Sequence, residues 1–264
     1  MALIRVHFNS TVFNMGTSLS VILPQYAAAP NRGGTSHKGP YRTLYLLHGM
    51  GGDCTEWLRN TSLERYAGAY SLAIVMPNGD NSFYSDLENG MSYQNFLTGE
   101  LIEKCEQWFP LSQNPEDRFI GGISMGGYGA LRTALTHPGL YGRVFGISSV
   151  TEILPLYEKV GFEDRAKMLF GPKETAIESG AELYAQLRRL HGARETLPKV
   201  CLIGGLSDPL CPQSERMAEA LRDAGGSVRL HRSEGGHDWA FGDRAIVDAL
   251  AWLFEKEEKS YGAF

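Results

Sequence analysis

The segment RFIGGISMGGYGALRTAL, residues 118–135, decides the fold. It begins with an apolar run that predicts a strand over Arg118–Gly122, and it continues with apolar residues at helical spacing that predict a helix between Ser124 and Pro138. The string Gly-Ile-Ser-Met-Gly at 122–126 therefore lies in a sharp strand-to-helix turn. Such a turn presents the serine hydroxyl at the end of a sheet, beside the free N–H groups at the start of a helix.

The string Gly-x-Ser-x-Gly alone is weak evidence for a nucleophile, because the chain has 31 glycines in 264 residues and about a quarter of a match per chain is expected by chance. The surrounding sequence must therefore support the interpretation. Elsewhere short apolar runs alternate with stretches of helical period, the pattern of an α/β fold. We predict strands over Ile4–Phe8, Thr17–Leu23, Thr43–Leu47, Leu72–Met76, Arg118–Gly122, Val144–Ser148, Val200–Gly204 and Val228–His231. Helical spacing occurs over Leu97–Trp108, Tyr128–Leu135, Met217–Ala224 and Ile246–Leu253. We expect one domain over residues 1–264, with an antiparallel hairpin first, a mostly parallel central sheet and helices on both faces.

Two segments interrupt this alternation. Ala27–Gly39 is rich in Gly, Pro and Ala and predicts an exposed loop. Thr151–Pro198 is too long for a simple crossover, although Ala181–His191 has a helical pattern. We interpret it as a cap-like insertion over the carboxyl edge of the sheet, where parallel sheets bind ligands. The alternative is a surface insertion without a role at the site.

Composition excludes several classes of protein. The chain is 43% hydrophobic and 21% charged, which is ordinary for a globular protein, and its net charge of −5 gives no basic surface for nucleic acid. The longest apolar runs are far shorter than the roughly 20 residues of a membrane helix, so we expect no membrane association. Met1–Ser10 shows no basic start followed by an apolar core, which predicts no signal peptide.

The four cysteines, Cys54, Cys105, Cys201 and Cys211, form no Cys-x-x-Cys pair, and none has a histidine at metal-ligand spacing. We therefore expect no metal site. Reduced thiols of this kind favour a cytoplasmic protein.

Ser124 requires a base to remove its proton and a carboxylate to orient that base, in the chain order serine, acid, histidine. Asp208 follows the predicted strand Val200–Gly204, so its carboxylate leaves the edge that presents Ser124. His237 follows the last predicted strand and precedes the last helix, where a loop histidine can reach the serine. The alternative for Asp208 is an ordinary turn aspartate, since Ser-Asp-Pro is good turn chemistry.

An oxyanion intermediate requires N–H donors. The turn supplies the backbone N–H of Met125, the residue after the serine, and the glycine-rich loop after Leu47 offers the N–H of Met50, with Gly49 as the reserve. His48 begins this loop, and we assign it no proton-transfer role. Aromatic side chains that could line a substrate pocket are Trp57, Tyr84 and Trp239, and for each of them core packing is the alternative.

Five motifs follow one another along the chain: His48-Gly49-Met50, Met76-Pro77-Asn78, the Gly122–Gly129 turn, Asp208 and Gly236-His237-Asp238-Trp239. These motifs and their order resemble the small esterases grouped with esterase D, especially the tributyrin-esterase-like bacterial carboxylesterases. The resemblance covers about Arg5 to Phe254 and is weakest across Thr151–Pro198. It implies an α/β-hydrolase fold, hydrolysis of short-chain acyl esters without a cofactor, and the triad Ser124, Asp208 and His237. It also implies a homodimer or homotetramer.

The similar S-formylglutathione hydrolases share the oxyanion position Met50, but this sequence departs from them at three places. His48 replaces a serine, Gly52 stands where they have a cysteine, and Ile123 replaces the histidine before the nucleophile. We therefore expect a serine carboxylesterase whose small-molecule substrates are acetyl to butyryl esters, acylated sugars among them. The alternatives are a thioesterase of the S-formylglutathione kind, a feruloyl or acetyl-xylan esterase, a serine peptidase of the same fold and a non-catalytic relative.

Overall fold

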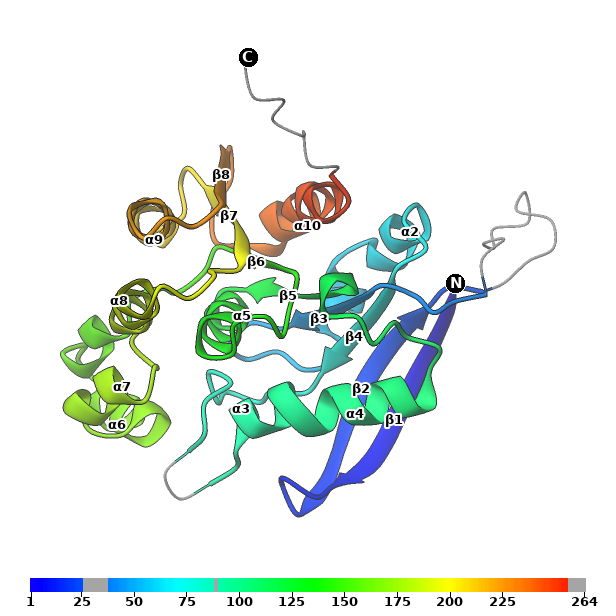
Figure 1. Ribbon diagram of the computed structural model, residues 1–264, viewed down its shortest axis with the longest axis horizontal. Helices are drawn as coiled ribbons and strands as arrows, with labels where there is room; N and C mark the ends of the chain where they lie inside the picture. The colour runs from blue at the N-terminus through cyan, green and yellow to red at the C-terminus, as the bar shows by residue number, and fades with distance from the viewer. Residues whose placement is uncertain (26–37, 88–89, 256–264) are drawn as a thin grey trace.

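A computed structural model describes residues 1–25, 38–87 and 90–255. Its centre is a sheet with the strand order β1-β2-β4-β3-β5-β6-β7-β8 (Figure 1). The strands are β1 Ala2–Ser10, β2 Met15–Leu23, β3 Thr43–Leu47, β4 Ala73–Pro77, β5 Arg118–Ile123, β6 Arg143–Ile147, β7 Lys199–Gly205 and β8 Val228–Ser233. The β1–β2 and β2–β4 pairs are antiparallel, and every pair from β4 to β8 is parallel. The α/β class, the first hairpin and all eight predicted strands are confirmed, with ends that differ by at most two residues.

The central strands are buried on both faces because their side chains alternate between two hydrophobic cores. In β3, for example, Tyr45 and Leu47 belong to one core and Leu44 and Leu46 to the other. Figure 1 shows α4 (Leu101–Trp108) and α5 (Met125–Thr136) over one face, with α2 (Leu63–Gly68) and α10 (Trp239–Leu253) over the other. The expected three-layer arrangement is therefore present.

All four predicted helical patterns form helices. They correspond to a π-helical turn at Phe96–Glu100 that continues into α4, to α5, to α9 (Cys211–Asp223) and to α10. The sequence analysis missed α1 (Glu56–Asn60), α2 and the single turn α3 (Tyr93–Asn95), which are too short to show a helical period. The described residues also include two 3₁₀ turns, at Pro115–Asp117 and Leu154–Tyr157.

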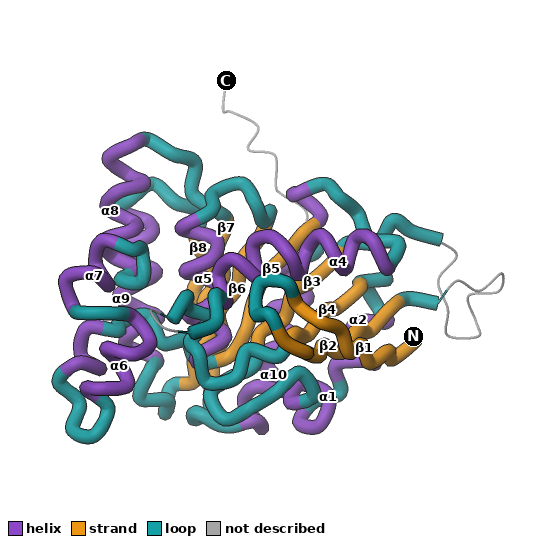
Figure 2. The backbone as a smooth tube through the Cα atoms, turned by 90° about the horizontal axis from the view of Figure 1, so that it is seen from below, coloured by secondary structure: helices purple, strands orange, loops and turns teal. Residues whose placement is uncertain are grey.

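The segment Thr151–Pro198 folds mainly into α6 (Glu163–Phe170), α7 (Lys173–Glu178) and α8 (Leu183–Ala193), which gather at one side of the molecule (Figure 2). Within it, α8 packs against α5 and α9. This agrees with the helical pattern of Ala181–His191. Most of the predicted loop Ala27–Gly39 lies outside the described residues.

Across the three described ranges, no helix has the length and the apolar character that a membrane crossing requires.

Gly121 in β5 tests how tightly the two cores are packed. A Cβ at this position would collide with the ring of Phe145 on the neighbouring strand β6, and that ring is fully buried. We expect Gly121→Ala to lower the free energy of unfolding by about 1–3 kcal/mol, because the core has no room for the methyl group. Urea unfolding measures this loss. Gly192→Ala in α8 is the control: a Cβ there meets nothing within 4 Å, so stability should stay equal or rise. Equal stability of Gly121→Ala and the wild type would contradict the packing described here.

Candidate active site

Ser124 lies at the turn between β5 and α5 in a strained conformation, with φ 55° and ψ −115°. Backbone hydrogen bonds hold it there. The Ser124 N–H donates to the Ile147 carbonyl of β6 at 2.8 Å, and the Ser124 carbonyl accepts from the N–H of Tyr128 at 3.1 Å. A non-glycine residue at positive φ costs of order 1–3 kcal/mol, and such strain is concentrated at functional sites.

The glycines that flank Ser124 are required by a close approach of backbones. A Cβ on Gly122 would lie 2.5 Å from the carbonyl carbon of Gly126 and 2.7 Å from the carbonyl oxygen of Leu47. A Cβ on Gly126 would collide with the Leu47 oxygen and lie 2.7 Å from that of His48. The first and last glycines of the string thus allow the end of β3 to lie directly beside the turn.

The structure brings Ser124, His237 and Asp208 together. The Ser124 Oγ lies 3.1 Å from the His237 Nε2, and the His237 Nδ1 lies 3.0 Å from the Asp208 Oδ2. With Nδ1 donating to the carboxylate, Nε2 is free to accept the serine proton. The Asp208 side chain is fully buried, whereas that of His237 is 41% exposed. The histidine is therefore open to a substrate, while its carboxylate partner is not.

The loops that carry these two residues are joined by backbone hydrogen bonds that extend the β7–β8 pairing. The Leu206 N–H donates to Ser233 and the Ser207 N–H to Gly235, each at 2.9 Å. Asp208 is held further by the Leu210 N–H, which donates to its Oδ1 at 2.8 Å. The Asp238 side chain accepts from the Phe241 N–H at 2.8 Å and so caps α10 directly after His237. Hydrogen bonds at the ends of regular secondary structure thus hold both Asp208 and His237 in place.

The pKa shifts of the pair agree with this geometry. The hydrogen bond to Asp208 raises the pKa of His237, and this effect exceeds the opposing effect of burial. Burial raises the pKa of Asp208, but the hydrogen bonds from His237 and the Leu210 N–H and the nearby Ser148 side chain outweigh it, so the net pKa is lowered. Ser148, which the sequence analysis missed, is buried directly after β6 with a φ of 48°.

The two N–H groups predicted for an oxyanion lie near the serine. Met125 is the first residue of α5, so its N–H has no acceptor within the helix. The Met50 N–H donates to no acceptor among the described residues. A Cβ on Gly49 would lie 3.7 Å from the Cβ of Ser124, so the loop that carries Met50 passes close to the nucleophile. Both predicted donors therefore belong to backbone that lies close to Ser124.

The side chains of His48, Asn81 and Tyr84 hold that loop in place through hydrogen bonds. The Gly79 N–H donates to the His48 Nε2 at 2.9 Å, the Tyr84 hydroxyl donates to the His48 carbonyl at 3.1 Å, and the Asn81 Oδ1 accepts from the Gly51 N–H at 2.6 Å. Burial lowers the pKa of His48 and keeps the imidazole neutral, as the accepting Nε2 requires. His48 is thus a structural residue of the loop, in agreement with the absence of a proton-transfer role.

A pocket of about 150 Å³ opens beside the serine. Its lining residues are Gly49, Met50, Glu56, Ile123, Ser124, His237, Asp238 and Trp239. Trp239 belongs to it as expected. The expectation for Trp57 and Tyr84 is corrected, because both are buried below the pocket: the Trp57 indole N–H donates to the Leu47 carbonyl at 3.1 Å, and Tyr84 supports the loop.

The lining contradicts one further expectation and adds one residue. None of the described residues that line this pocket comes from Thr151–Pro198, so the insertion does not form its wall. Glu56, the first residue of α1, does line it, and the sequence analysis missed this residue because α1 is too short to be recognised. Burial raises the pKa of Glu56, while Arg59 and the side chain of Trp239 lower it less strongly.

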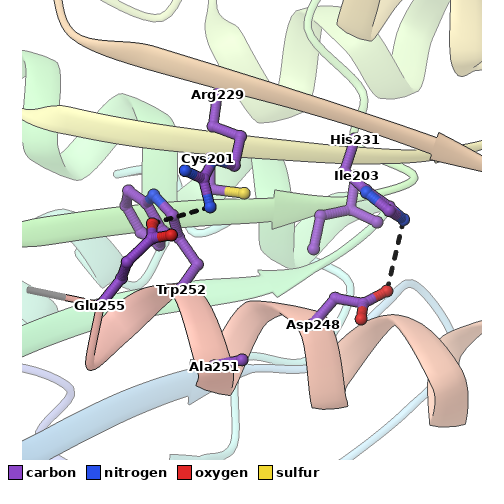
Figure 3. A pocket seen from close by; sticks show the side chains of 8 residues that line it. All are labelled: Cys201, Ile203, Arg229, His231, Asp248, Ala251, Trp252 and Glu255. Carbon is purple, nitrogen blue, oxygen red and sulfur yellow. Dashed lines mark ion pairs between the residues drawn. The ribbon is translucent and has the colours of Figure 1, made fainter.

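A second pocket, of about 210 Å³, lies between the β7–β8 edge of the sheet and α10 (Figure 3). Arg229 forms an ion pair with Glu255 at 2.7 Å in this pocket, and the His231 Nε2 lies 3.4 Å from the Asp248 Oδ2. The triad is not part of it. Within the described ranges, no group of three or more His, Cys, Asp or Glu side chains could hold a metal ion.

Comparisons with known proteins agree with this site. Residues 10–253 match the family model described as "Putative esterase". An acetyl esterase of Caldicellulosiruptor saccharolyticus is 31% identical over 96% of this chain and 98% of its own length. Among solved structures, the substrate-bound fluorophosphonate-binding serine hydrolase FphF of Staphylococcus aureus is 31% identical, with a TM-score of 0.86 over 97% of this chain and 99% of its own.

The S-formylglutathione hydrolase FrmB of Staphylococcus aureus is 30% identical, with a TM-score of 0.84 over 96% of this chain and 99% of its own. These near-complete matches extend the resemblance first seen in the motifs to the whole fold, which is that of the α/β-hydrolase serine hydrolases. The chain therefore belongs to this esterase family, and it is a carboxylic ester hydrolase.

Proposed function

We propose that the protein is a serine carboxylesterase that hydrolyses short-chain acyl esters through an acyl-enzyme intermediate. The observation that carries this proposal is the 3.1 Å contact between the Ser124 Oγ and the His237 Nε2, with Asp208 on the far side of the imidazole. A serine hydroxyl is a poor nucleophile unless a base accepts its proton, and this geometry provides that base.

Each group then has a role in the reaction. The Ser124 Oγ attacks the ester carbonyl while His237 takes its proton, and the N–H groups of Met50 and Met125 stabilise the oxyanion. His237 returns the proton to the leaving alcohol, and Asp208 keeps the imidazole in the correct tautomer. Water, activated by His237, then hydrolyses the acyl-enzyme.

The size of the pocket supports small substrates. A pocket of about 150 Å³ has room for a group about as large as benzene, which is enough for an acetyl or butyryl group. The acetyl esterase of Caldicellulosiruptor saccharolyticus, at 31% identity, supports acetyl esters as substrates.

A second candidate is a thioesterase of the S-formylglutathione kind, which the 30% identity to FrmB favours. His48, Gly52 and Ile123, the three departures from that group, argue against it. The ratio of kcat/KM for S-formylglutathione to that for p-nitrophenyl acetate separates the two candidates. The tributyrin-esterase grouping, a cytoplasmic location and a homodimer or homotetramer all stay predictions.

The nucleophile is tested by Ser124→Ala. We expect the variant to hydrolyse p-nitrophenyl acetate at least about a thousandfold more slowly than the wild type, because no other group forms the acyl-enzyme. The wild type should prefer acetate and butyrate to octanoate, whose chain exceeds the pocket. Release of p-nitrophenol measures both effects, and circular dichroism checks that the variant is folded. Equal rates in the two proteins would refute the mechanism.

The raised pKa of His237 predicts the pH profile. Only the neutral imidazole accepts the serine proton, so kcat/KM should rise with pH as His237 loses its proton, with a midpoint above the ordinary histidine value of 6.5. The profile is measured with p-nitrophenyl acetate from about pH 5 to 9. Glu56→Gln is the control, because it removes another group of raised pKa from the pocket and should leave the midpoint in place. A midpoint that moves with this substitution would assign the titration to Glu56.

A further inference from the structure

The peptide that joins Gly49 to Met50 carries one of the two N–H groups proposed to bind the oxyanion. It is a trans peptide, so its carbonyl, on Gly49, and its N–H, on Met50, point in opposite directions. Because the peptide is planar, whatever holds the carbonyl also sets the direction of the N–H. The groups that bind the Gly49 carbonyl are therefore candidates for positioning residues of this site.

Two groups hold this carbonyl. The His48 Nδ1 lies 2.7 Å from the Gly49 oxygen, and the Gly52 N–H donates to the same oxygen at 3.2 Å. The bond from Gly52 closes a four-residue turn, and the φ of 87° at Gly51 is the conformation that the third residue of a type II turn adopts. The N–H of the second residue, Met50, takes no part in the hydrogen bond of such a turn and stays available.

The second nitrogen of His48 determines which tautomer is present. The Gly79 N–H donates to Nε2 at 2.9 Å, so Nε2 carries no proton and Nδ1 is the donor to Gly49. His48 is only 1% exposed. Burial lowers the pKa of His48, although the Gly49 carbonyl, Asp53 and Asp80 oppose this effect. A neutral imidazole thus connects the loop after β4 to the carbonyl of Gly49.

The peptides on either side are held as well. The Tyr84 hydroxyl donates to the His48 carbonyl at 3.1 Å, and the two rings pack edge to face with centroids 5.8 Å apart. On the other side, the Asn81 Oδ1 accepts from the Gly51 N–H at 2.6 Å. Each successive peptide from His48 to Gly51 is therefore oriented by a side chain. Between these anchors, the Met50 N–H is the group that no described residue engages.

We propose that His48 is a positioning residue for ester hydrolysis: its Nδ1–H holds the Gly49 carbonyl and thereby directs the Met50 N–H toward the oxyanion that forms at Ser124. Asn81 assists by fixing the next peptide. This proposal rests on the proposed function, because the oxyanion arises only in acyl transfer. His48 moves no proton in this role. Removal of one oxyanion donor costs about 10²–10³ in kcat, and a donor that loses its orientation costs part of that factor.

Two substitutions separate the two nitrogens of His48. In His48→Asn the Nδ2 is bonded to Cγ, as Nδ1 is in histidine, so it still donates to the Gly49 carbonyl while the Gly79 N–H loses its acceptor. In His48→Gln the amide lies one bond further out, so Oε1 replaces Nε2 and the donor to Gly49 is lost. We expect His48→Gln to lower kcat for p-nitrophenyl acetate about tenfold to a hundredfold with KM unchanged, and His48→Asn to stay within about fivefold of the wild type.

A ketone inhibitor and thermal unfolding distinguish positioning from a merely structural role. 1,1,1-Trifluoro-2-butanone forms a hemiketal with Ser124 whose oxyanion requires the same N–H, so its Ki should rise in His48→Gln by the factor by which kcat/KM falls. Both variants lose a buried hydrogen bond, and His48→Asn also leaves a cavity, so it should melt at a temperature no higher than that of His48→Gln. Activities that followed the melting temperatures would show a structural role, and we expect the opposite order.

His7→Gln is the matched control. His7 is an exposed histidine of β1 whose Nδ1 also has a hydrogen-bond partner, the Ser18 Oγ at 2.8 Å, so kcat and Ki should equal those of the wild type. Asn81→Ala removes the anchor of the next peptide from an exposed position and leaves the core unchanged. We expect this variant to lower kcat about tenfold without changing KM.

Three results would overturn the proposal while Ser124-dependent hydrolysis by the wild type persists, which leaves the proposed function intact. They are a wild-type kcat in His48→Gln, an equal loss of kcat in His48→Asn and His48→Gln, and a loss that appears only in KM. Should His48→Gln not fold, an unchanged kcat and Ki in Asn81→Ala would overturn the proposal instead. Failure of the wild type to hydrolyse p-nitrophenyl acetate would overturn the proposed function as well.

Discussion

The carbonyl oxygens of Leu47 and His48 lie so close to Gly122 and Gly126 that a side chain at either glycine would collide with backbone. This close approach places the end of β3 against the turn that holds Ser124. Leu47 and Gly122 are register partners in the parallel β3–β5 pair, so the loop that carries Met50 and the turn that carries Ser124 leave the sheet side by side. The sheet thus sets the relative position of this loop and Ser124.

The backbone strain of this arrangement is concentrated at Ser124. Its strained φ of 55° persists because its N–H bonds to β6 and its carbonyl accepts from the first turn of α5. The donor loop is held in a similar way by the groups of Gly79, Asn81 and Tyr84. Groups that are far apart in the sequence therefore converge on one rigid frame, which is the kind of support that the proposed oxyanion site would need.

Residue pattern was sufficient to predict the sheet, and it selected Ser124, Asp208 and His237, which the structure brings within hydrogen-bonding distance, because each of them follows a predicted strand. Trp57 and Tyr84 show where pattern fails: an aromatic residue near a site in sequence packs either into the pocket or below it, and only the three-dimensional path of the chain decides. The course of Thr151–Pro198 could not be predicted either. Of its helices, α8 packs against α5 and α9, and contacts between helices that are far apart in the sequence leave no periodic signal in the sequence.

Glu56 was missed for a different physical reason. It begins the five-residue helix α1, which is too short to show a helical period, so the sequence does not place its side chain. What distinguishes it is the absence of a side chain at Gly52, which lets the carboxylate fold over the backbone and enter the pocket. The glycine-rich loop thus has two effects. It brings the loop that carries Met50 close to Ser124, and it leaves room for the Glu56 carboxylate, which lies against the α-carbon of Gly52 and lines the same pocket as Ser124.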